Sequence, residues 1–183
     1  QTGVRFRADL PKERRGYLQL AHLRDRVTQQ LFDMVERPSR TLDIIPWFAV
    51  DDAVYVLARA SYPRPIVATL GETTPALDGR HSAGYVVEPM VVVQTDAPVG
   101  VTAETVLKRA AGVSPGEIRG FSEGDVYYPS PGGIREAVRS VHVQIDPKFV
   151  NAPASNRTGY SELGRVLSIE AQQLLRAAQV GGL

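Results

Sequence analysis

The first pattern of apolar and polar positions runs from Pro11 to Glu36. Large apolar residues recur there three or four positions apart, with polar residues between them: Leu20, Leu23, Val27, Leu31 and Met34. This spacing is typical of one face of an amphipathic helix. We therefore expect an N-terminal helix that packs on its own domain or on a second copy. It should end before Pro38, because proline cannot continue the helical hydrogen bonds.

The next apolar positions follow a pattern that favours strands. Two runs rich in β-branched residues, 42–50 and 53–58, flank Asp51-Asp52 and predict a hairpin. Pro46 predicts that the first strand lies at an edge or carries a bulge, because proline lacks the N–H that a central strand donates. The predicted elements that follow are, in order, an irregular segment interrupted by prolines at 59–66, a loop at 69–83, and a strand pair or one bent strand over 84–94 with Pro89 at the break.

The C-terminal half begins with a short helix. Thr102 is a suitable N-cap for a helix over Ala103–Ala111, and Gly112 is suited to the left-handed position that ends one. The elements expected after it are a strand within 118–126, an exposed loop at 129–133, an alternating strand over 138–145, a loop over 147–160, a short strand at 166–167 and a helix from Ile169 to about Val180 capped by Ser168.

Composition narrows the class of protein. The 183 residues suffice for one domain with a real core, and the net charge of +1 gives no field that favours nucleic acid or a membrane surface. The chain has no cysteine, so it has no disulfide, thiolate nucleophile or cysteine metal site, and we expect a cytoplasmic protein. Its start at Gln1 and its end in VGGL suggest a piece of a longer polypeptide.

Four segments in order resemble the Nudix superfamily, in particular its ADP-ribose and nucleotide-sugar pyrophosphatases. They are VYVLARASYPRPI (54–66), VVEPMV (86–91), VYYPSPGGIREAVRSVHVQI (126–145) and RVLSIEAQQLLRAAQVGGL (165–183). The resemblance implies an α+β fold in which a curved mixed β-sheet lies between helices. It divides the chain into an N-terminal helical extension, 1–37, and a Nudix-like domain, 38–183.

The same resemblance implies a magnesium site that this chain departs from. The family signature is Gly, five residues, Glu, seven residues, Arg-Glu, an aliphatic residue, any residue, Glu-Glu, any residue, Gly, and its helix glutamates converge on Mg²⁺. When the signature ends at Gly112, Val106, Arg109 and Ala110 occupy the three helix glutamate positions, and Thr105 occupies the arginine position. Because Glu104 is the only acid between residues 100 and 112, we expect neither the usual metal cluster nor a resident cofactor.

The resemblance also selects candidate site residues. For a surviving ligand pocket they are Arg59, Arg64, Glu88 and Tyr128; Glu136 and Glu104 would be catalytic only in an active enzyme. The planar guanidinium of arginine can donate two hydrogen bonds to a diphosphate, and tyrosine can stack on a base or a sugar. Each residue also has an ordinary alternative, as a surface charge, a capping residue or part of the core.

Three functions remain open at this stage. The first is a catalytically silent domain that binds a nucleotide or nucleotide-sugar, or a protein partner, in a regulatory role. The second is a Mg²⁺-dependent pyrophosphohydrolase in which Glu88, Glu104 and Glu136 converge on the metal. The third is a module that forms a homodimer, or contacts a neighbouring domain, through the apolar stripe of the N-terminal helix. Neither nucleic acid nor a membrane is expected as a partner.

Overall fold

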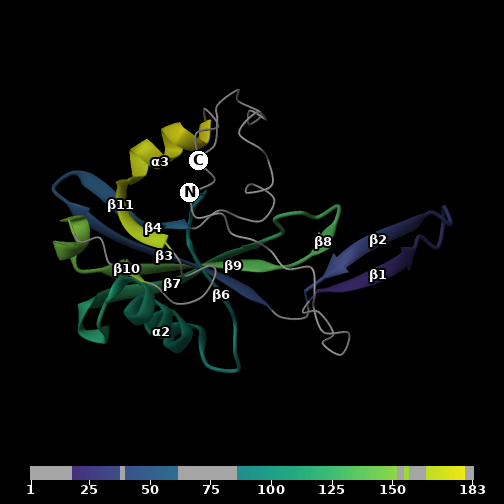
Figure 1. Ribbon diagram of the computed structural model, residues 1–183, viewed down its shortest axis with the longest axis horizontal. Helices are drawn as coiled ribbons and strands as arrows, with labels where there is room; N and C mark the ends of the chain where they lie inside the picture. The colour runs from purple at the N-terminus through teal and green to yellow at the C-terminus, as the bar shows by residue number, and fades with distance from the viewer. Residues whose placement is uncertain (1–17, 38–39, 62–85, 152–154, 157–163, 180–183) are drawn as a thin grey trace, which may run out of the picture.

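The computed structural model describes residues 18–37, 40–61, 86–151, 155–156 and 164–179 (Figure 1). These residues form an α+β fold with a three-stranded sheet, an eight-stranded sheet and two helices. The strands of the large sheet are β3 (Thr41–Val50), β4 (Ala53–Ser61), β5 (Val86–Glu88), β6 (Met90–Val93), β7 (Ile118–Tyr127), β9 (Val138–Ile145), β10 (Ser155–Asn156) and β11 (Gly164–Glu170). Within these ranges no helix is long and apolar enough to cross a membrane.

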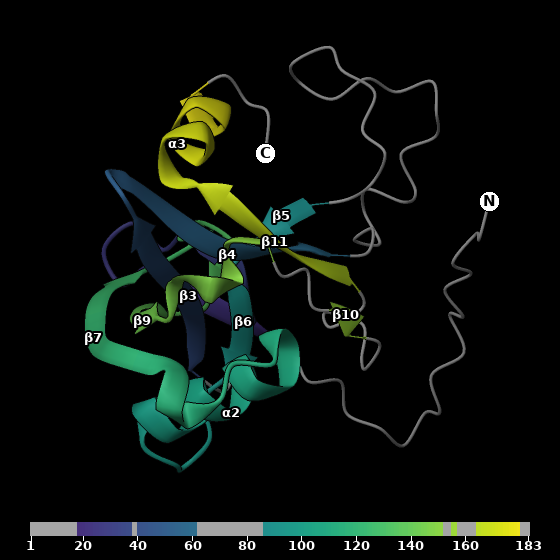
Figure 2. The same cartoon turned by 90° about the vertical axis from the view of Figure 1, so that its left-hand side faces the viewer.

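The large sheet is mixed and lies between the two helices. Its order is β10-β11-β4-β3-β9-β7, with β5 beside β4 and β6 beside β3. The pair β3–β9 is parallel and the others are antiparallel. The helices α2 (Val99–Ala111) and α3 (Ala171–Gln179) lie on opposite sides of this sheet (Figures 1 and 2). The expected mixed sheet between helices is therefore present.

Strand β3 lies at the centre of the sheet and pairs with β9 in an unbroken register over Thr41–Trp47, so the expectation that Pro46 marks an edge or a bulge is wrong. The first part of β3, Thr41–Ile44, pairs with β6, and its last part, Trp47–Val50, pairs with β4. Pro46 lies between the segments that pair with β6 and with β4. Neither pairing therefore requires the backbone N–H that proline lacks. The predicted hairpin at Asp51-Asp52 is confirmed, and Asp51 takes a φ of 51° there.

Helix α2 covers one face of the sheet and supplies much of the core. Its buried residues recur along one side: Thr102, Ala103, Val106, Leu107, Ala110 and Ala111. It begins at Val99, four residues before the expected start, and the Thr102 hydroxyl donates to the carbonyl of Pro98 instead of capping the helix. Gly112 ends the helix as predicted, with a φ of 70° that favours glycine.

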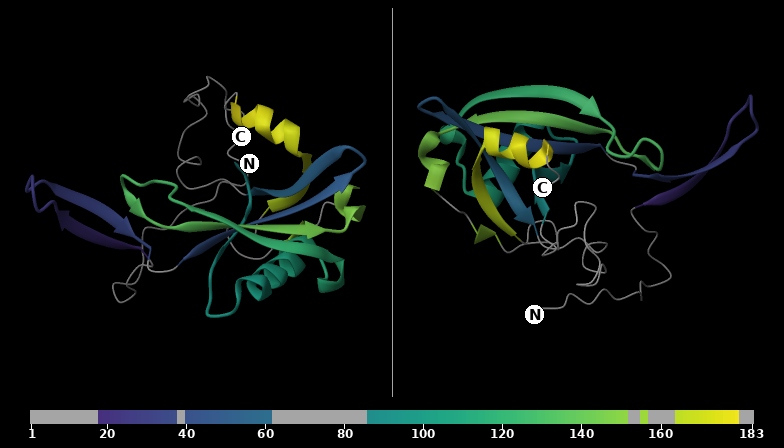
Figure 3. Two further views of the ribbon diagram at one scale, coloured as in Figure 1. Left: turned by 180° about the vertical axis from the view of Figure 1, so that it is seen from behind. Right: turned by 90° about the horizontal axis from the view of Figure 1, so that it is seen from above.

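The expected N-terminal helix is wrong in the described range, which forms a β-hairpin from residue 19. Strands β1 (Gln19–Arg24) and β2 (Leu31–Glu36) pair antiparallel, and this hairpin extends away from the large sheet (Figures 1 and 3). The turn explains the difference, because the Asp25 carboxylate accepts hydrogen bonds from the backbone N–H groups of Val27 (2.6 Å) and Thr28 (3.0 Å). Asp commonly stabilises turns in this way, and Gln29 takes a φ of 61° that a helix does not allow.

We call residues 18–36 the hairpin arm, and its base is tied to the loop before β9. Strand β2 pairs in parallel with the short strand β8 (Ile134–Arg135). The Val35 N–H donates to the Gly133 carbonyl at 2.9 Å, and Arg135 pairs with Glu36 at 3.0 Å. The arm is thus attached where the loop 129–133 (PSPGG) leads back to the sheet.

The last third of the chain departs from expectation at one boundary. Strand β11 runs over Gly164–Glu170, so it includes Ser168, and helix α3 begins at Ala171. Ser168 therefore does not cap the helix. The expected loop over 147–160 contains a 3₁₀ turn, Pro147–Asn151, and the short strand β10.

Candidate functional site

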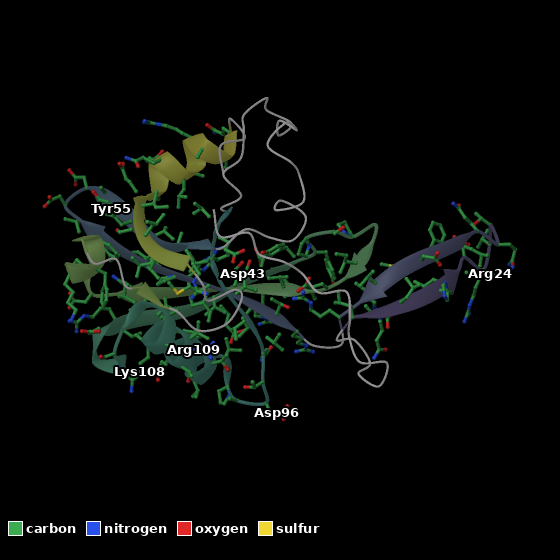
Figure 4. The ribbon with its side chains drawn as sticks, viewed as in Figure 1. Arg24, Asp43, Tyr55, Asp96, Lys108 and Arg109 are labelled. Carbon is green, nitrogen blue, oxygen red and sulfur yellow. The ribbon has the colours of Figure 1, made fainter. Side chains whose placement is uncertain are left out.

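A cleft of about 610 Å³ opens between the start of β3, the β5–β6 bend and helix α2. Its charged lining residues come from elements that are far apart in the sequence: Arg37, Asp43, Glu88, Arg109 and Glu136. The rest of the wall is formed by Thr41, Tyr127 and apolar residues, among them Pro89, Val91 and Val138. Asp43 and Arg109 are labelled in Figure 4, one on the sheet and one on the helix below it. A concave site with convergent polar groups beside apolar residues is a candidate small-molecule site.

Glu136 is held in place by two donors. It lies between β8 and β9, and its side chain is 12% exposed. The guanidinium of Arg37, which follows β2, and the hydroxyl of Thr41, the first residue of β3, each donate to the same oxygen, Oε1, at 2.7 Å. This carboxylate is thus fixed by the residue that follows the hairpin arm and by the first residue of β3.

Asp43 is the most buried acid of the cleft. It lies on β3 with 6% of its surface exposed, and Tyr127 at the end of β7 donates its hydroxyl to Oδ2. Burial is the main factor that raises the pKa of Asp43, and the nearby carboxylates of Glu136 and Glu88 raise it further, although the Tyr127 hydrogen bond opposes them. The pKa of Tyr127 is raised too, chiefly by burial and also by its bond to Asp43, so the phenol remains a donor.

The raised pKa of Asp43 predicts a specific pH dependence of stability. Its folded-state pKa lies above the unfolded value, so the folded state holds this proton more tightly. The stabilisation of the folded state by protonated Asp43 is fully present below about pH 4, and it is lost as the pH rises through the folded-state pKa. We expect Asp43→Asn to remove this loss and to be more stable than the wild type at neutral pH.

The measurement is a series of thermal unfolding curves for both proteins from about pH 4 to about pH 7. The difference in stability between the two proteins at each pH reports the contribution of Asp43. Acids with lowered pKa values, such as Glu117 and Asp146, are present in both proteins, and their contribution to stability rises with pH instead of falling. Parallel curves for the two proteins would contradict the assignment.

The structure brings two of the candidate site residues into the cleft. Glu88 and Glu136 line it. Arg59 lies on β4 and is 4% exposed; it pairs in register with Glu88 but is not a lining residue. Tyr128 is 59% exposed and Glu104 is exposed on α2, and neither lines the cleft. Arg64 lies outside the described residues.

Sequence reasoning did not select Arg37 or Asp43 for the site. A signal for Asp43 was present, because it is the one charged residue in the run LDIIPWFAV, and a charge inside a buried strand usually has a specific partner. No comparable signal marks Arg37, which reaches Glu136 across 99 positions of sequence.

The positions of helix α2 at issue in the family signature have different environments. Val106 and Ala110 are buried in the core, at 6% and 1% exposure, and only Arg109 lines the cleft. In the described ranges no three His, Cys, Asp or Glu side chains are grouped so that they could hold a metal ion. The convergence of Glu88, Glu104 and Glu136 that an active hydrolase would need is thus not found.

No model of a protein family matches the chain, and no curated protein matches its sequence.

Proposed function

We propose that this chain is a Nudix-like domain that binds a nucleotide or nucleotide-sugar in the cleft and does not hydrolyse it. The elements that support the proposal are a mixed sheet between helices, a helix that ends at a left-handed glycine, and a proline-glycine loop at the rim of the cleft. They occur in the order that the resemblance implies.

The observation that carries the proposal is the place of Arg109. In the signature this helix position belongs to a carboxylate that binds Mg²⁺. Here a guanidinium lines the cleft that also contains Asp43, Glu88 and Glu136. A fixed cation at this place repels a divalent metal and attracts phosphate oxygens, which arginine can bind with two parallel hydrogen bonds.

The other lining residues complement the remaining parts of such a ligand. Carboxylates accept hydrogen bonds from sugar hydroxyls, and both Asp43 and Glu136 are held by neighbouring donors in fixed positions. Pro89, Pro129 and the nearby valines offer an apolar surface for a ring. The cleft volume of about 610 Å³ is within the range of sites for small molecules.

The test is a thermal shift with ADP-ribose, with and without Mg²⁺. A ligand that binds only the folded state at a hundred times its Kd stabilises by about 2.7 kcal/mol, which is roughly 5–10 °C for a domain of this size. We expect the shift to be the same with and without the metal. Arg109→Ala should abolish it, because the phosphate contact is lost.

The matched control is Lys108→Ala, which removes a cation from the adjacent position of α2 that does not line the cleft. This variant should respond to ADP-ribose as the wild type does. A shift that requires Mg²⁺, together with release of AMP, would replace the proposal by a pyrophosphohydrolase. No shift under either condition would reject nucleotide-sugar binding.

A further inference from the structure

A second, smaller hollow of about 210 Å³ lies at one end of the neighbouring strands β6, β3, β9 and β7. Its lining residues are Arg40, Thr41, Gln94, Val126, Ala137 and Arg139. Thr41 also borders the cleft, so the hollow lies next to it. Arg109 and the acids of the proposed ligand site line the cleft and not the hollow, which makes the hollow a separate candidate site.

The hollow is built from backbone segments that are hydrogen bonded side by side. Ala137, directly before β9, accepts a hydrogen bond from the Thr41 N–H at 3.3 Å. The N–H of Gln94, directly after β6, donates to the carbonyl of Arg40 at 2.8 Å. The methyl group of Ala137 is much smaller than the neighbouring side chains of Arg40 and Arg139, so it leaves space beside them.

Two guanidinium groups line the hollow, and none of its described lining residues is acidic. Arg139 donates from Nη1 to Glu123 on β7. A guanidinium has five N–H donors, so this bond orients Arg139 and leaves donors for a ligand. Arg40 is exposed, and no acid of the described chain forms an ion pair with it, although Asp96 lines an adjoining hollow that Arg40 also borders. The hollow itself therefore presents positive charge.

We propose that this hollow binds a phosphate group of a small molecule between Arg40 and Arg139, independently of the cleft and of the function proposed for it. Arginine can donate two parallel hydrogen bonds to phosphate oxygens, and the side-chain amide of Gln94 supplies a further donor. The hollow is smaller than the sites of about 300–1,000 Å³ that enclose whole ligands, so it suits one charged group and not an entire nucleotide.

The first experiment titrates inorganic phosphate into the full chain and follows the backbone amide NMR shifts, with sodium chloride keeping the ionic strength constant. We expect saturable shifts around Arg40 and Ala137. Arg40→Ala or Arg139→Ala should weaken this binding by at least about tenfold, because each removes a charged hydrogen-bond donor. The matched control is Arg119→Ala, which removes an acid-paired arginine of β7 that does not line the hollow and should leave the binding unchanged.

Two further variants test the shape of the hollow and its independence from the cleft. Ala137→Leu keeps every charge but fills the hollow, so it should also abolish phosphate binding there. Arg109→Ala should remove the response to ADP-ribose and keep the phosphate shifts around Arg40. The proposal would be overturned by loss of those shifts in Arg109→Ala, by undiminished binding in Ala137→Leu, by equal weakening in Arg40→Ala and Arg119→Ala, or by the absence of saturable shifts in the wild type.

A comparison of anions tests the chemical class of the ligand. Glycerol 3-phosphate should bind with the same variants as inorganic phosphate, because it carries the same group on a carbon atom. Acetate should bind more weakly, because its two oxygens can reach fewer of the donors of Arg40, Arg139 and Gln94 at once. Equal binding of acetate and phosphate would contradict a phosphate site.

Discussion

Leu107→Ala should lower the stability of the domain by about 2–5 kcal/mol, because it leaves a cavity between α2 and the sheet. Leu107 is fully buried and belongs to a cluster with Leu42, Ile44 and Met90 from two strands of the sheet. The deleted methyl groups lose their transfer free energy, and the helix cannot close the gap without moving Val106 and Ala110, which are buried on the same side.

Chemical denaturation of the purified variant measures this loss of free energy, and thermal unfolding should show a fall in Tm of roughly 4–20 °C. Val101→Ala on the same helix is the control, because its side chain is 51% exposed and its truncation should change stability by no more than about 0.5 kcal/mol. Equal losses in the two variants would mean that α2 does not pack on the sheet by the face described here.

Arg37→Ala should lower stability by roughly 2–3 kcal/mol, since it leaves the carboxylate of Glu136 with one of its two described donors. The pair is partly shielded from water, with side-chain exposures of 30% for Arg37 and 12% for Glu136. The expected loss is below that of a fully buried pair, because the Thr41 hydroxyl still donates to Glu136 and water can reach the space left by the arginine.

A double-mutant cycle separates this ion pair from general packing. Adding Glu136→Gln to Arg37→Ala removes the uncompensated charge, so the double variant should recover part of the loss. The surface pair Arg119–Asp146, at 2.9 Å with Arg119 57% exposed, is the comparison, and Arg119→Ala should cost no more than about 1 kcal/mol. Strict additivity of the two cleft substitutions would contradict a direct interaction.

Local patterns predicted the elements of the large sheet well. The β3–β4 hairpin, the bend at Pro89 between β5 and β6, the alternation of β9 and the glycine that ends α2 all follow from short-range rules on turns, strands and caps. Those rules act within a few residues, so a single sequence contains them. The positions of Glu88 and Glu136 beside one cleft depended on the order of segments that resemble a known family.

The N-terminal prediction failed because its apolar spacing fits two structures. Leu20, Leu23, Val27, Leu31 and Met34 align on a helix, but the hairpin places Leu23 beside Phe32 and Leu20 beside Val35. The deciding interaction is the Asp25 side chain on the turn, which competes locally with helical hydrogen bonds. The contacts of Arg37 and Tyr127 with cleft acids join residues more than 80 positions apart, and no local rule reveals them.

The base of the hairpin arm and one wall of the cleft consist of the same short pieces of chain. Arg37 directly follows β2 and holds Glu136, and Glu136 directly follows β8, which pairs with β2. A ligand that moves Glu136 would therefore also move the base of the arm, and a molecule that binds the arm and moves its base would also move Glu136. If the two binding events are coupled, thermodynamic reciprocity requires each of them to change the free energy of the other by the same amount. The Arg37–Glu136 contact and the β2–β8 pairing are the connections through which such coupling would act.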